Sequence, residues 1–110
     1  MCHIEIKHYR DLSRDELYEI LALRVLVFVV GQKITVEPEI DGRDPACAHA
    51  MLWSAGPDAK ARRLIGTARL FVDEVPVVVG RVAVHPDFQR RGLGSELMRA
   101  VQGFLAGRSA

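Results

Sequence analysis

The chain has 110 residues, of which 49% are hydrophobic and 26% charged, and its formal net charge is +1. This composition is typical of a single soluble globular domain, and its charge balance predicts neither a nucleic-acid nor a membrane partner. The longest apolar run, Val25 to Val30, is too short to span a bilayer. Cys2 and Cys47 stand in no metal-ligand spacing, so we expect free thiols in a cytoplasmic protein without a metal.

The N-terminal third predicts one strand and one helix. Residues Ile4 to Tyr9 alternate between apolar and polar side chains, as in a short half-buried strand. Ser13 and Glu16 have the spacing of a capping box, in which each side chain bonds the other residue's backbone N–H. The apolar positions that follow recur at helical spacing and predict a helix from about Asp15 to Phe28. Gly31 is a natural stop.

Residues Gln32 to Pro45 form the least regular part of the chain, since turn-forming residues dominate there. Arg24 lies close to the apolar face of the preceding helix, where we expect it to snorkel or to form an ion pair. The acidic side chains of the irregular segment form either a solvated loop or, as a group, a surface that faces a cationic amine. These acids are Glu37, Glu39, Asp41 and Asp44.

Three further strands are predicted in succession. His49 to Trp53 and Leu64 to Val72 read as an antiparallel pair joined by a turn at Gly56-Pro57-Asp58. Val77 to Val84 is an almost unbroken β-branched run, which predicts a strand buried on both faces. Pro86 ends this run because proline cannot donate to a sheet ladder.

A basic loop with two glycines joins the last strand to an amphipathic helix. The loop reads Gln89-Arg90-Arg91-Gly92-Leu93-Gly94-Ser95, and apolar residues from Leu97 to Leu105 recur at helical spacing. Outward backbone N–H groups and the helix dipole favour an anion at such a junction. The glycines allow close approach of a ligand, and the arginines add positive charge.

Several interpretations compete for this loop. A Walker-type phosphate loop requires a lysine after the glycines, and none follows here. A dinucleotide-binding loop requires G-x-G-x-x-G directly after the strand, whereas Leu97 occupies the third glycine position. A flexible glycine loop with solvated arginines is the explanation that involves no ligand.

The loop resembles the Q/R-x-x-G-x-G/A signature of the GCN5-related N-acetyltransferases (GNAT), because Gln89 to Gly94 match every defined position. The strand before it and the helix after it are also similar to those of the family. The resemblance spans about Leu17 to Leu105 and is greatest to the ElaA-like branch. It is carried by Leu23-Arg24, Val27-Phe28-Val29-Val30-x-Gln32, Asp41-Gly42-x-Asp44, His49, Ala68-Arg69 and Gly80-Arg81-Val82.

The resemblance implies an α/β (α+β) GNAT-like acyl-CoA N-acyltransferase fold, with a mixed, mostly antiparallel sheet flanked by helices. It implies one domain over residues 1–110 and direct attack of a primary amine on acetyl-CoA in a ternary complex. The acceptor would be a small molecule or a peptide. The residues expected to hold acetyl-CoA are Val82, Ala83, Val84, Gln89, Arg90, Arg91, Gly92, Leu93, Gly94 and Ser95.

A carboxylate acting through water could take the proton that the amine must lose. The sequence does not rank the candidates for this general base, which are Glu37, Glu39, Asp41, His49 and Glu74. His49 on a strand is also explained as a hydrogen-bonded core histidine. Cys47 is not expected to be a nucleophile, because direct transfer needs no acyl-enzyme.

The resemblance also implies a departure from the family. The family fold continues with another strand, a helix that commonly carries an acid tyrosine, and usually two more strands. This sequence stops at Ala110, and its tyrosines, Tyr9 and Tyr18, lie far upstream; Gly31 stands where the branch usually has glutamate. We therefore expect the N-terminal two-thirds of the fold, C-terminally incomplete, and self-association such as a homodimer. A catalytically inactive acetyl-CoA-binding module and an oligomerising module stay open as alternatives.

Overall fold

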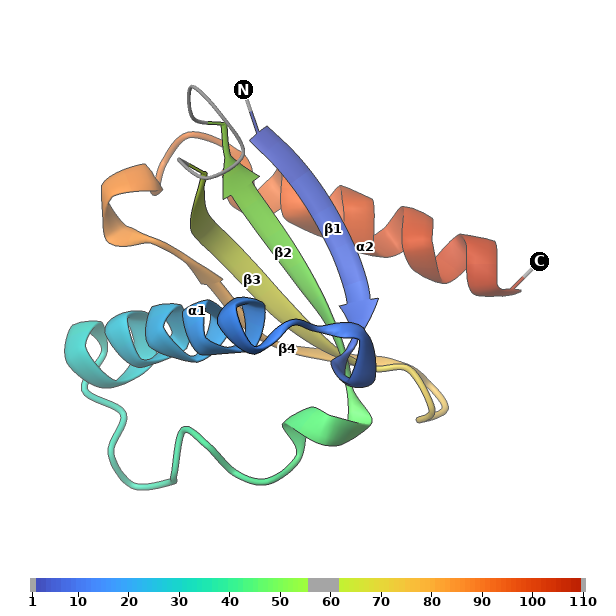
Figure 1. The fold of residues 1–110 in the computed structure, drawn as a ribbon, viewed down its shortest axis with the longest axis horizontal. Helices are drawn as coiled ribbons and strands as arrows, with labels where there is room; N and C mark the ends of the chain where they lie inside the picture. The colour runs from blue at the N-terminus through green and yellow to red at the C-terminus, as the bar shows by residue number, and fades with distance from the viewer. Residues whose placement is uncertain (1, 56–61, 110) are drawn as a thin grey trace.

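The structure, a computed structural model, describes residues 2–55 and 62–109. Its main elements follow the predicted order of strand, helix, three strands and helix (Figure 1). They are β1 (Cys2–His8), α1 (Arg14–Arg24), β2 (Ala48–Ser54), β3 (Arg63–Phe71), β4 (Val78–Val84) and α2 (Leu93–Ser109). The strands form one sheet in the order β1-β2-β3-β4, with every neighbouring pair antiparallel. The turn predicted at Gly56-Pro57-Asp58 lies outside the described residues.

The first helix begins as predicted and ends differently. The Ser13 hydroxyl accepts from the Glu16 N–H at 3.0 Å, and Glu16 Oε1 accepts from the Ser13 N–H at 2.8 Å, which completes the capping box. After Arg24 the chain continues as a wider π-helical segment, η2 (Val25–Gly31), instead of one α-helix to Phe28. The Gln32 N–H donates to the Val27 carbonyl at 3.0 Å, which closes the last wide turn.

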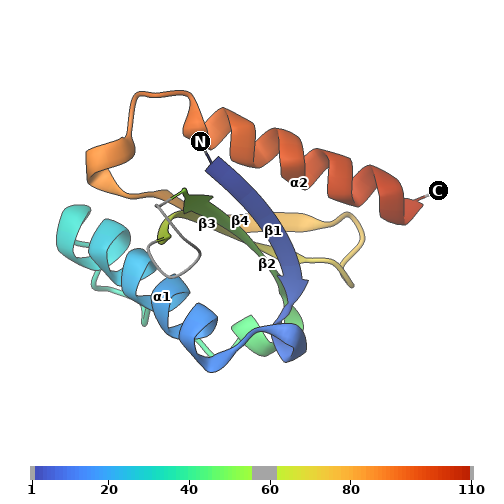
Figure 2. The ribbon, with the colours of Figure 1, turned by 45° about the horizontal axis from the view of Figure 1, so that its top comes forward.

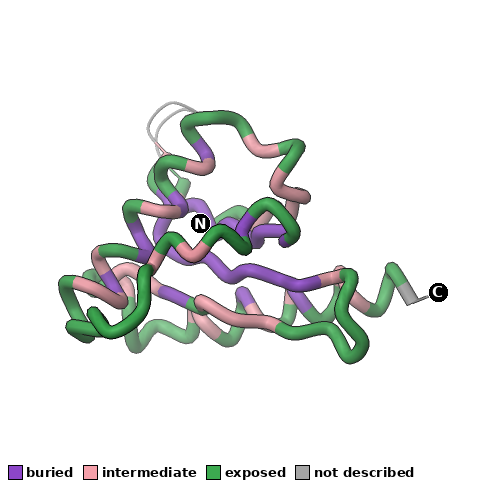
Figure 3. The backbone as a smooth tube through the Cα atoms, turned by 90° about the horizontal axis from the view of Figure 1, so that it is seen from below, coloured by how far each residue is buried: buried purple, intermediate pink, exposed green. Residues whose placement is uncertain are grey.

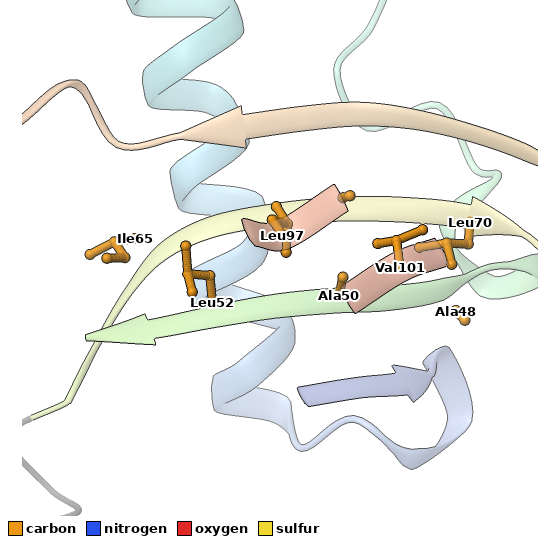
Figure 4. Close-up of a cluster of buried hydrophobic side chains, with 8 residues drawn as sticks. Ala48, Ala50, Leu52, Ile65, Leu70, Leu97 and Val101 are labelled. Carbon is orange, nitrogen blue, oxygen red and sulfur yellow. The ribbon is translucent and has the colours of Figure 1, made fainter. Parts of the chain in front are cut away.

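The two helices cover opposite faces of the sheet (Figure 2). Because side chains alternate along a strand, each face has its own apolar cluster. The cluster under α2 joins Leu97 and Val101 to residues of β2 and β3 (Figure 4). The cluster under α1 and η2 joins Ile20, Leu23 and Val27 to the other faces of the strands. Its strand members are Met51, Trp53, Leu64 and Ala83.

The last strand is an edge strand, and the expectation of burial on both faces is wrong. Among the described strands, β4 pairs only with β3. Val78 and Val82 are 45% and 38% exposed, and Ala83 is the buried residue of the strand. Figure 3 shows the burial concentrated in the middle of the sheet. A β-branched run predicts a strand but cannot report which neighbours cover it, since tertiary packing decides that. The expected self-association stays a prediction.

Candidate active site

The loop between β4 and α2 presents a row of backbone N–H groups. Arg90 and Gly92 have φ angles of 65° and 74°, and such left-handed residues turn successive N–H groups toward one side. The first intrahelical bond of α2 runs from the Glu96 N–H to the Gly92 carbonyl at 3.1 Å. The helix therefore supplies no acceptor for the N–H groups of Leu93, Gly94 and Ser95. With the helix dipole, these donors make the junction a site for an anion.

The structure explains only one of the two glycines of this loop. Gly92 is explained by its backbone, because its φ of +74° is strained for a residue with a side chain. Gly94 has no such angle, and an added Cβ would meet only Val84 Cγ2, at an ordinary 3.9 Å. Neither packing nor conformation therefore requires glycine at position 94. A ligand that approaches the helix N-terminus closely, such as the pyrophosphate of a CoA, would require it.

The side chains of the loop fit the same ligand. Arg90 and Arg91 are exposed, and the Arg91 guanidinium lies 5.3 Å from the centroid of the Phe88 ring. The Gln89 side chain points the other way, since its Nε2 donates to the Val84 carbonyl at 3.0 Å. Gln89 thus ties the loop to the end of β4, while both arginines stay available to phosphates.

A β-bulge shapes the strand next to the loop. Thr67 pairs with Ala83 and Arg69 with Gly80, so two residues, Arg81 and Val82, oppose the single residue between Thr67 and Arg69. The bulge gives Arg81 a φ of 50°. The pairing of β4 with β3 is regular before and after the bulge and is interrupted at Arg81 and Val82.

One residue of the bulge and one residue after it turn polar backbone groups to the open edge. The His85 N–H donates to the Ile65 carbonyl at 2.7 Å, which fixes the alternation of the antiparallel ladder. By this alternation Ala83 bonds toward β3, whereas Val82 and Val84 point to the open edge of β4. Of the three strand residues predicted to bind acetyl-CoA, Val82 and Val84 have the suitable direction. Gln89 already occupies the Val84 carbonyl.

Three arginines bind most of the acids of the irregular segment. Arg24 is 1% exposed, and its guanidinium donates to Asp44 Oδ1 at 2.6 Å and to Glu39 Oε2 at 2.8 Å. Arg69 donates to both carboxylate oxygens of Asp41, at 2.9 and 2.7 Å, and to Asp44 Oδ1 at 3.1 Å. Arg81 Nε donates to Glu39 Oε2 at 3.0 Å. These contacts tie residues 39–44 to α1, β3 and β4.

The network keeps its acids ionised. The Arg69 hydrogen bonds are the main reason why the pKa of Asp41 lies far below its usual range. Burial by itself raises the pKa of Asp44, but hydrogen bonds and charges from Arg24 and Arg69 outweigh it and lower this pKa overall. Both carboxylates are therefore weak proton acceptors. The sequence predicted either a solvated loop or a surface that faces a cationic amine. Asp41 and Asp44 fit neither prediction, because arginines of the same chain bind both.

His49 lies in the core. It is fully buried, and its Nε2 must carry the proton because its partner at 3.1 Å is the Asp44 carbonyl, which can only accept. Its other ring nitrogen, Nδ1, is buried without a partner among the described residues. Burial lowers the pKa of His49. His49 is therefore a hydrogen-bonded core histidine, the alternative to a general base. A fully buried ring cannot reach a proton on a bound substrate.

The remaining candidates lie on opposite sides of the network. Glu74 follows β3 and forms an exposed ion pair with Arg43 at 3.3 Å. Glu37 lines a pocket with Phe28, Ile34, Glu39, Arg81 and Val82. Only Glu37 therefore shares a pocket with the bulge and is not held by a cation in the described part of the chain.

Cys47 does not have the properties of a nucleophile. It is fully buried, its Sγ lies 3.4 Å from the Arg43 carbonyl, and burial raises the pKa of its thiol to about 11. A thiol with such a pKa is almost entirely protonated near neutral pH.

An ion pair was one of the two expectations for Arg24, but the sequence analysis did not anticipate Arg69 and Arg81 as partners of the acids. Arg69 stands inside a strongly apolar strand and is 5% exposed, and a charge in such a strand requires a buried partner. The position of Arg69 in the sequence could therefore have predicted a buried acidic partner. Arg81 carried no comparable signal, because the bulge that turns it toward Glu39 is hidden in a regular β-branched run.

Solved structures with a similar fold include an acyl-CoA N-acyltransferase. The chain superposes on an acyl-CoA N-acyltransferase from Pseudomonas aeruginosa with a TM-score of 0.78 and 38% identity, covering 93% of this chain and 69% of that one. It superposes on ElaA from Escherichia coli with a TM-score of 0.84 and 29% identity, covering 97% and 71%. The fold is thus that of the acyl-CoA N-acyltransferases.

Comparison with curated sequences finds relatives of the same kind as the structural comparison. A UPF0039 protein of Schizosaccharomyces pombe is 41% identical over 93 residues, which cover 84% of this chain and 58% of that protein. In sequence, Escherichia coli ElaA is 35% identical over 96 residues, with 83% and 58% covered. The chain therefore spans somewhat more than half the length of these relatives. The model of the acetyltransferase (GNAT) family matches residues 12–110, and the chain belongs to this family.

Proposed function

We propose that this protein is an N-acetyltransferase that moves the acetyl group of acetyl-CoA to a primary amine by direct attack in a ternary complex. Family membership supports acetyl transfer in general. The observation that carries the specific proposal is the position of the free N–H groups of Leu93 to Ser95, since a Cβ at position 94 would lie 3.9 Å from Val84 Cγ2 at the open edge of β4. A ligand whose phosphates bind at Leu93 to Ser95 would extend along the open edge of β4.

Each part of acetyl-CoA has matching groups. The pyrophosphate would accept from the N–H groups of Leu93, Gly94 and Ser95 and would be neutralised by Arg90 and Arg91. The amides of the pantetheine arm would pair with the outward backbone groups of Val82 and Val84, as an added strand does.

The thioester would lie at the bulge. There the Val82 N–H is a preorganised donor for the negative charge that develops on the carbonyl oxygen. The bound thioester supplies the activated acetyl group, and the chain supplies its binding, orientation and polarisation.

An acetyl-CoA-binding module without turnover is the second candidate. It is favoured by the arginine network, which makes Asp41 and Asp44 poor bases. Both candidates bind acetyl-CoA, and only the enzyme forms an acetylated amine.

The binding site is tested by Gly94→Glu, which places a carboxylate where the pyrophosphate would lie. The packing around position 94 admits a Cβ, so the variant is expected to fold. Gly103→Glu is the matched control, because it makes the same change on the same helix at an exposed position with open space. Calorimetric titration with CoA should show binding to the wild type and to the control, and none to Gly94→Glu. Equal affinity in all three proteins would remove the proposed site.

A further inference from the structure

We propose that Glu37 is the catalytic proton acceptor, and that the pocket beside it binds the alkyl ammonium end of the acceptor. This inference rests on the proposed acetyl transfer and specifies its acceptor. It is carried by the geometry of one pocket, lined by Phe28 of η2, Ile34, Glu37 and Glu39 of the irregular segment, and Arg81 and Val82 of β4.

The pocket lies where an acceptor is needed. Val82 belongs both to the wall of the pocket and to the open edge of β4. An amine in the pocket would therefore approach a thioester held at the bulge from the side of the irregular segment. Proximity of this kind is a large part of what an enzyme supplies to a two-substrate reaction.

The charges of the pocket select a cation. Glu39 lines the pocket, but its Oε2 already accepts from Arg24 at 2.8 Å and from Arg81 at 3.0 Å. Glu37 has no hydrogen bond or ion pair with any part of the chain that the structure describes. Glu37 is exposed, and of the three charged side chains in the wall it is the one whose charge is balanced by no residue that the structure describes. A bound ammonium would compensate it.

The size and the apolar residues of the pocket limit the rest of the acceptor. Its volume is about 170 Å³, room for roughly five or six water molecules at about 30 Å³ each. Phe28, Ile34 and Val82 offer apolar surface and no hydrogen-bonding side chain. We therefore infer an unbranched primary alkylamine with an apolar stem, and we expect a hydroxyl-rich amino sugar to fit poorly.

A larger cavity of about 470 Å³ lies on the far side of α1 and is a poorer candidate. Its wall holds more acids than cations, namely Asp11, Asp15, Glu16 and Glu19 against Lys7 and Arg62, so its charge alone does not exclude a cation. It includes no residue of β4 or of the basic loop.

The proposed step moves the acetyl group from sulfur to nitrogen and releases one proton. The acceptor enters as an ammonium and gives one proton to the Glu37 carboxylate, directly or through a water, and this proton passes to solvent. The nitrogen lone pair then forms the N–C bond as the C–S bond breaks. The second proton of the nitrogen goes to the departing thiolate, so the products are the N-substituted acetamide, CoA thiol and one released proton.

The test is Glu37→Gln in the full chain, with Glu19→Gln as the matched control, since Glu19 is exposed on α1 and lines neither the pocket nor the basic loop. The acetylation of butylamine and of glucosamine is followed by mass spectrometry. General-base loss typically costs 10²–10⁴-fold, so we expect kcat for butylamine to fall at least about 100-fold in Glu37→Gln and to stay within about twofold in the control. Both variants should bind CoA as the wild type does, which shows that each is folded.

A rise of pH gives an independent readout. More amine is already deprotonated at high pH, so the deficit of Glu37→Gln should shrink as pH rises. The other charged groups facing this pocket are Glu39 and Arg81, which bind each other and are present in both proteins.

The outcomes separate the two proposals. Unchanged kcat in Glu37→Gln, or a raised KM alone, would overturn the proton-acceptor role. Glucosamine as good a substrate as butylamine would overturn the alkylamine class. No CoA binding to the wild type would instead remove the proposed function on which this inference rests.

Discussion

Asp44 shows how single residues decide the properties of this site. Its carboxylate is 4% exposed and accepts from Arg24 and from Arg69, while its own backbone carbonyl accepts from His49. Taking one charge out of such a network leaves the opposite charges buried without full compensation. The residue therefore serves the folding of the irregular segment, and through it the position of Glu37 and Glu39.

We predict that Asp44→Asn lowers the free energy of unfolding by about 3 kcal/mol near pH 7, as is typical when one partner of a buried ion pair is removed. Because the pKa of Asp44 is lowered in the folded state, its contribution is present above the unfolded value of 3.8 and is lost as pH falls through the folded value. The deficit of the variant should therefore shrink near pH 3. Urea unfolding at both pH values measures it, and a deficit that is equal at both would contradict the account.

Burial of His49 adds a second, milder acid sensitivity. Its pKa lies below the ordinary histidine value of 6.5, so the unfolded chain takes up this proton at a higher pH than the folded chain does. Stability should thus begin to fall below about pH 6.5 in both the wild type and Asp44→Asn.

At the scale of elements, local sequence patterns predicted most of what the structure contains. The β-branched run and the helical spacing located β4 and α2 to within a few residues, because periodicity is a local property. The pairing of Asp41 with Arg69, the bulge at Arg81 and the exposure of Val82 could not be predicted in this way. Each depends on segments that meet only in the folded chain.

The basic loop was predicted from sequence as an acetyl-CoA site, and its residue roles stay predictions. If Arg90 and Arg91 contact phosphates as exposed cations, CoA binding should weaken as salt rises, because surface charges are screened within about 10 Å at 0.1 M ionic strength. Replacing both with alanine should weaken binding and flatten this dependence. The control replaces the exposed Arg10 and Arg14 with alanine, which changes the net charge equally but far from the loop in the sequence. The control should keep the salt dependence of the wild type. An unchanged slope in the loop variant would assign Arg90 and Arg91 to solvent.

At the scale of the whole molecule, two helices on opposite faces of an antiparallel sheet bring the three parts of the site together. The basic loop follows β4 almost directly in the sequence, whereas the pocket at Glu37 joins residues 28–39 to Arg81 and Val82 of β4. The strand β4 is thus the element that the three parts share. No helix in the described ranges is long and apolar enough to cross a membrane. A cytoplasmic location and self-association stay predictions.

The most direct test of the central claim is the formation of an acetylated amine. Wild type and Gly94→Glu are incubated with acetyl-CoA and a panel of primary alkylamines, and the acetamide is quantified by mass spectrometry. We predict product in excess of the enzyme with the wild type, at a rate proportional to enzyme concentration, and none above the uncatalysed level with Gly94→Glu. A wild-type protein that binds CoA yet acetylates no amine in the panel would contradict the claim and identify a binding module instead.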